Sequence, residues 1–126
     1  MKKLVLFTLV AVAVPSAAIA ARGDMNLATF IAKADALQAQ GPFALMSPDL
    51  EVLKAEGSAA GQSYKQRLLS ERAKGKPSSC PPENARIVPE ELVNFLKTAY
   101  PANARPRVTI RQGVADYFIR KFPCRR

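Results

Sequence analysis

The chain of 126 residues contains no histidine. Histidine is the most common general base in enzymes, and it also serves in Ser-His triads and in many zinc sites. The only two cysteines are too few for a four-cysteine zinc site, and no glycine-rich phosphate loop follows a strand pattern. We therefore expect a protein that is not an enzyme and that uses neither a metal nor another cofactor.

Acidic residues are also scarce, because ten Asp and Glu stand against 19 Lys and Arg, which gives a formal net charge of +9. We expect Glu51, Glu56 and Glu71 to be solvated rather than to form a catalytic pair. A positive surface favours acidic partners, such as an acidic protein surface, anionic lipid headgroups or a cell-wall polymer. The alternative is that the positive charge serves only solubility.

The N-terminus has the layout of a secretory signal peptide. Residues 1–3 are positive at Lys2 and Lys3, residues 4–14 are uncharged and apolar, and small residues surround Ala20. The apolar run is shorter than the roughly 20 residues that a membrane-spanning helix needs. We predict that residues 1–20 are removed on export to the periplasm. This removes two lysines, and residues 21–126 remain as one small domain of net charge +7.

Apolar residues at helical spacing predict four helices. Caps and breakers place them from Asn26 to Gly41-Pro42, from Ser47 to about Arg72, from about Pro89 to Tyr100-Pro101, and from Thr109 to Lys121. The apolar connector 43–46 is expected to pack against the core. Gly57 and Gly61 share one face of the second helix, which predicts close approach of another helix there or a break in this one.

The third and fourth helices are similar in length and are joined by a short turn, so they should run antiparallel. Cys80 precedes the third helix and Cys124 follows the fourth, which places both at the same end of this hairpin. Cysteines of exported chains usually pair, and a disulfide that closes such a loop contributes about 4 kcal/mol. The predicted fold is all-α: a small single-domain bundle of about four helices without a sheet, whose C-terminal hairpin is closed by one disulfide.

Basic residues gather around the turn of this hairpin. Arg105, Arg107 and Arg111 flank the turn and are our candidates for binding a partner. The alternative is a solvated face with no binding role. A basic second helix after a short turn is also typical of helix-turn-helix proteins, but the predicted export and disulfide argue against a nucleic-acid partner.

The chain from Cys80 onwards carries a series of short motifs, namely Cys80-Pro81-Pro82, Leu92-Val93, Phe95-Leu96, Pro101 and Phe122-Pro123-Cys124. This series resembles the Rap/Tai-type immunity proteins, small helical periplasmic proteins associated with type VI secretion. The resemblance implies a homodimeric protein that binds a cell-wall amidase effector and blocks its active-site groove. The N-terminal half lacks the further cysteines that many members have.

Two other functions remain open from the sequence. One is a small basic periplasmic binding or chaperone-like protein, and the other is a structural accessory protein of the envelope. A shared hairpin is compatible with any of the three, because a fold does not determine a function.

Overall fold

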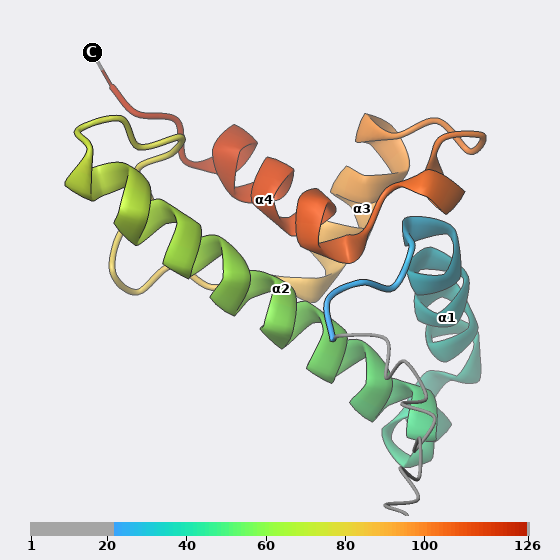
Figure 1. The fold of residues 1–126 in the computed structure, drawn as a ribbon. Helices are drawn as coiled ribbons and strands as arrows, with labels where there is room; N and C mark the ends of the chain where they lie inside the picture. The colour runs from blue at the N-terminus through green and yellow to red at the C-terminus, as the bar shows by residue number, and fades with distance from the viewer. Residues whose placement is uncertain (1–21, 126) are drawn as a thin grey trace, which may run out of the picture.

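The computed structural model describes residues 22–125, so the predicted signal peptide 1–20 lies outside the described residues. Four α-helices follow one another along the chain (Figure 1): α1 (Leu27–Gln40), α2 (Pro48–Ala73), α3 (Pro89–Ala99) and α4 (Ile110–Lys121). Short 3-10 helices, η1 (Gly41–Met46) and η2 (Arg105–Arg107), lie between them. Between residues 22 and 125 there is no strand beyond one isolated bridge, Asn26 to Thr109. The all-α prediction is therefore confirmed.

The helices begin where capping side chains satisfy free backbone N–H groups. The Asn26 side chain accepts a hydrogen bond from the Thr29 N–H, the Ser47 hydroxyl accepts from the Asp49 N–H, and the Thr109 hydroxyl accepts from the Gln112 N–H. Helix α3 has no cap of this kind, and the Tyr117 hydroxyl of α4 instead accepts from the Val88 N–H, at 3.4 Å. None of the helices in the described part of the chain is long and apolar enough to cross a membrane.

The core lies where the four helices meet, and each helix contributes a buried stripe. Its members are Leu27, Phe30, Ile31, Ala60, Tyr64, Leu68, Leu92, Leu96, Ile110, Val114, Ala115, Tyr117 and Phe118. Helix α4 makes its most extensive contacts with α2, and Figure 1 shows the two helices side by side. The rings of Tyr64 and Phe118 stack across this contact with centroids 5.5 Å apart.

The predicted disulfide is present between Cys80 and Cys124, whose Cα atoms lie 4.9 Å apart. The Cys80 N–H also donates to the Phe122 carbonyl at 2.8 Å. Between α3 and α4, Glu91 pairs with Lys121 near one end and Leu96 meets Gly113 farther along. These contacts run in opposite directions along the two helices, which is the antiparallel sense that was predicted.

The connector 43–46 does not pack against the core, and this prediction was wrong. Phe43, Leu45 and Met46 are 74%, 81% and 84% exposed. They belong to η1, which turns the chain at the corner between α1 and α2 (Figure 1). Because Gly41 ends α1 and Ser47 already caps α2, the connector is too short to fold back over the core.

Helix α2 is unbroken, so the prediction of one long helix from Ser47 to about Arg72 is confirmed. The prediction of close helix approach at Gly57 and Gly61 was wrong, because no helix in the described part of the chain packs against either glycine. Leaving aside the adjoining residues and backbone of α2, a Cβ atom at Gly57 would meet no heavy atom within 4 Å, and one at Gly61 would meet only the Ile87 side chain, at 3.3 Å. The glycine that permits close helix packing is Gly113 in α4. A Cβ there would lie 2.7 Å from Leu96 Cδ2.

Two of the three glutamates that were expected to be solvated hold backbone segments against α2. The Glu56 carboxylate accepts hydrogen bonds from the N–H groups of Gly23 at 2.6 Å and Met25 at 3.2 Å. The Glu71 carboxylate accepts from the N–H and the hydroxyl of Ser78. The Ser78 hydroxyl also lowers the pKa of Glu71, with smaller contributions from the Ser78 N–H and Arg67. These carboxylates fix the positions of the segments before α1 and after α2.

Candidate binding groove

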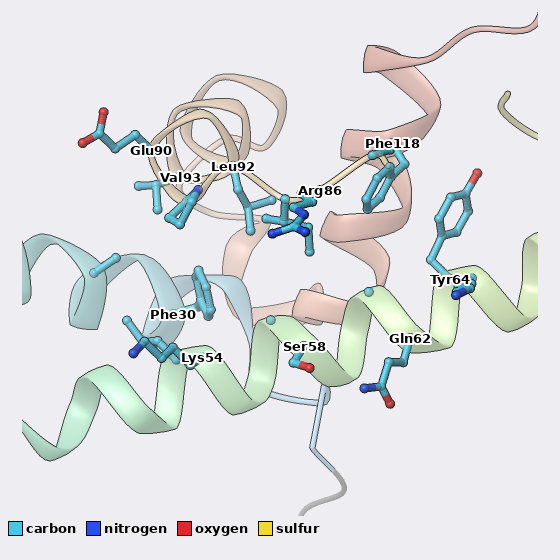
Figure 2. A pocket seen from close by; sticks show the side chains of 18 of the residues that line it. Phe30, Lys54, Ser58, Gln62, Tyr64, Arg86, Glu90, Leu92, Val93 and Phe118 are labelled. Carbon is cyan, nitrogen blue, oxygen red and sulfur yellow. The ribbon is translucent and has the colours of Figure 1, made fainter. Parts of the chain in front are cut away.

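A groove with a volume of about 1250 Å³ runs along α2. Helix α2 forms one wall, and α3 with the segment that precedes it forms the other. Residues of α1 lie at one end, and Phe118 of α4 lies between the walls (Figure 2). The groove is larger than the 300–1,000 Å³ that is typical of small-molecule pockets.

The groove exists because α2 presents small side chains to it. Gly57, Ser58 and Gly61 line the middle of the α2 wall, and Ile87 covers only Gly61. At one end of this wall, the segment after α2 is held to the helix, since the Tyr64 hydroxyl is hydrogen-bonded to Ser78 and Ser79. Beyond this anchor the opposite wall does not close onto α2, because Gly57 has no side chain and Ser58 only a small polar one for it to pack on.

The lining is apolar with a positive excess. The apolar residues are Phe30, Ala34, Leu37, Ala44, Leu50, Leu53, Leu68, Leu69, Pro81, Pro82, Ala85, Ile87, Pro89, Leu92, Val93 and Phe118. The charged residues are the basic Lys54, Lys65, Arg72, Arg86 and Lys97 and the acidic Glu83 and Glu90. The groove therefore combines apolar surface with five basic and two acidic side chains.

The basic side chains differ in how far other residues already engage them. Lys97 pairs with Asp35 at 2.6 Å. Lys54 lies 3.5 Å from Glu51, and the side chains of Lys54 and Glu51 are both well exposed. Lys65 and Arg86 form no ion pair with any other residue between 22 and 125. Exposed pairs such as Lys54 with Glu51 contribute little free energy. Three cations, Lys54, Lys65 and Arg86, are therefore open to an external carboxylate.

Three hydroxyl groups near the groove, those of Tyr64, Ser78 and Ser79, are engaged in hydrogen bonds within the fold. Ser79 is completely buried, and its hydroxyl is hydrogen-bonded to that of Tyr64. Among residues 22–125, no group of three His, Cys, Asp or Glu side chains could hold a metal ion. The groove is thus equipped for binding by apolar contact and positive charge.

Titratable groups with shifted pKa values lie in the contact between α3 and α4. Burial raises the pKa of Tyr100, and the hydrogen bond that its hydroxyl donates to Asp116 adds to this rise. Lys121 lowers the pKa of Glu91, and the Tyr117 hydroxyl adds to the effect. In return, Glu91 raises the pKa of Lys121. These shifts reflect pairs that join the two helices.

The three arginines proposed from the sequence occupy different environments. Arg105 donates to the carbonyls of Tyr100 at 3.0 Å and Lys97 at 2.9 Å, so it caps the C-terminal end of α3. Arg111 pairs with Asp24 at 3.3 Å. Arg107 is exposed and has no ion pair within the described part of the chain. A role in partner binding remains a prediction for all three, and Arg107 is the one whose loss we expect to leave the fold intact.

Sequence reasoning did not find the groove. The only signal was the pair Gly57 and Gly61 on one face of α2, for which the sequence predicts close approach of another helix or a break in this one. Comparison of the chain with models of protein families, with curated proteins and with solved structures found no match. The resemblance to the Rap/Tai-type immunity proteins therefore stays a prediction.

Proposed function

We propose that this chain is an exported, non-enzymatic binding protein that holds part of another exported protein in the groove along α2. The observation that carries the proposal is the groove itself, a large apolar hollow with a positive excess. Large exposed apolar surfaces with a polar rim are typical of interaction sites. The predicted signal peptide and the disulfide support an extracytoplasmic location for this binding.

The finer proposal is that the partner is a cell-wall amidase effector, which the protein inhibits as an immunity protein. Its support is the resemblance of the segment from Cys80 to Cys124 and the helix pair that this segment contains. The test is to titrate the purified protein, without residues 1–20, into peptidoglycan hydrolysis by the exported amidases of the same organism. We expect one amidase to be inhibited at a stoichiometric ratio. If none is bound or inhibited, the immunity role is wrong.

A second candidate is a chaperone-like protein that shields unfolded exported proteins. The exposed side chains of Phe43, Leu45 and Met46 favour it, because they add apolar surface outside the groove. In that case the protein should suppress aggregation of several unrelated unfolded clients. An immunity protein should act on its one partner only, so the same assay separates the two functions.

A further inference from the structure

One face of α2 has a layout that suits a second helix. Lys54 and Lys65 stand eleven positions apart, which is about 16 Å along an α-helix and close to three full turns, so they project to nearly the same side. Gly57, Ser58 and Gly61 lie between them on the groove wall. This face is therefore a shallow stretch of small residues with a cation at each end, and we call it the saddle.

The saddle is open to an incoming backbone. Apart from the adjoining residues and backbone of α2 itself, no heavy atom of the described residues lies within 4 Å of the position that a Cβ at Gly57 would take. Across the groove, Leu92 and Val93 of α3 and the nearby Ile87 supply an apolar wall. Figure 2 shows Lys54 and Ser58 on α2, with Arg86 on the opposite wall. An occupant in this position would contact apolar side chains on one side and small residues on the other.

We propose that the occupant is an amphipathic α-helix of the partner, with acidic side chains at two positions about eleven residues apart that meet Lys54 and Lys65. This inference rests on the proposed function and adds the chemistry of the partner. Helix-in-groove binding uses an apolar face for affinity, and the excess of basic over acidic lining residues selects for carboxylates. The groove follows α2 from Leu50 to Arg72, so the partner helix lies along α2.

The positive lining also argues against a second copy of this chain as the occupant. Two copies that met through their grooves would bring Lys54, Lys65 and Arg86 of one against the same cations of the other, which is unfavourable. A drug-sized ligand is normally buried over 70–90% of its surface. An open groove does not enclose a small ligand to that extent, whereas a helix can bind with only its apolar face buried in the groove.

The test uses two synthetic helical peptides of about 16 residues with the same leucine face. One carries Glu at two positions eleven apart, and the other carries Lys at the same positions. We expect the protein to bind the Glu peptide at least about tenfold more tightly than the Lys peptide. The double variant Lys54→Glu/Lys65→Glu should reverse this preference. The matched control is Lys74→Glu/Lys76→Glu, which changes the net charge equally at exposed positions outside the groove and should preserve it.

A second variant tests the groove without changing charge. Gly57→Leu places a large side chain in the saddle, where the structure has free space, so the fold should be retained while the Glu peptide is excluded. Ser70→Leu is the control, because it adds an exposed leucine to α2 outside the groove lining. Circular dichroism and thermal unfolding of each variant establish that the helices are intact.

Several results would overturn the inference. These are equal binding of the two peptides, no binding of either, or binding that survives Gly57→Leu. A dimer in light scattering that Gly57→Leu dissociates would identify a second copy as the occupant, and displacement of the Glu peptide by stoichiometric oleate would identify a fatty acid.

The outcome for the proposed function is separate. If an amidase is inhibited equally by the wild type, Gly57→Leu and the charge reversal, the immunity role stands, but the partner does not bind in the groove and the helix site is wrong. If the peptides behave as expected and no amidase is inhibited, the helix site stands and the immunity role is wrong.

Discussion

Two glycines in helix interiors should respond differently to the same substitution. Gly57 in α2 has free space around it, whereas Gly113 in α4 packs against two leucines. Replacing an interior helical glycine by alanine stabilises a helix by about 1 kcal/mol when nothing else changes. We expect Gly57→Ala to show this gain in full, because its new methyl group would meet no other atom.

The same change at Gly113 should be destabilising relative to Gly57→Ala. The new Cβ would lie 2.7 Å from Leu96 Cδ2 and 3.0 Å from Leu27 Cδ2, and both leucines are fully buried. Forcing an extra methyl group into a closely packed core costs about 1–3 kcal/mol. Since the helix-propensity gain is common to both variants, Gly113→Ala should be about 1–3 kcal/mol less stable than Gly57→Ala.

Urea unfolding followed by circular dichroism measures this difference directly. Thermal unfolding should show Gly113→Ala melting below Gly57→Ala, by about 4–8 °C for each kcal/mol in a domain of this size. The comparison between variants removes uncertainty about the absolute stability of the wild type. Equal stability, or a more stable Gly113→Ala, would show that the packing between α1, α3 and α4 is not as close as the structure has it.

Three further predictions concern the polar contacts of the fold. Tyr64→Phe leaves the buried Ser79 hydroxyl without its partner and should cost about 1–3 kcal/mol in urea unfolding, most of which the added change Ser79→Ala should restore; no loss would mean that water replaces the tyrosine hydroxyl. The pKa of Glu71 is lower in the folded state than its ordinary value of 4.5, so its stabilising contribution is present above that pH and is lost as the pH falls through the folded-state pKa. The free energy of unfolding of Glu71→Gln should therefore fall less steeply than that of the wild type below about pH 4.5, and parallel curves would contradict the Ser78 contacts. Arg105→Ala should lower the melting temperature because α3 loses its C-terminal cap, whereas Arg107→Ala should leave it unchanged; the opposite order in a thermal scan would refute the capping role.

The sequence by itself determined the helices and their ends. Asn26, Ser47 and Thr109 act as caps in the structure at the positions that were predicted, and Gly41 ends α1 with a positive φ of 57°. These outcomes are local, because a cap bonds to an N–H only two or three residues away. The pairing of Cys80 with Cys124 was also predictable, since no other cysteine exists to compete.

Only the tertiary structure decided how the helices meet and what they leave open. Gly57 and Gly113 are both glycines within helices, yet one lines a groove and the other is packed against leucines, and nothing in their neighbouring residues distinguishes them. The roles of Glu56 and Arg105 were likewise hidden, because Glu56 bonds to backbone groups more than 30 positions away and Arg105 to carbonyls before the turn. Helical periodicity reports which face of a helix is apolar. It does not report whether another element of the same chain covers that face. The part of α2 around Gly57 is left uncovered, and it forms the floor of the groove.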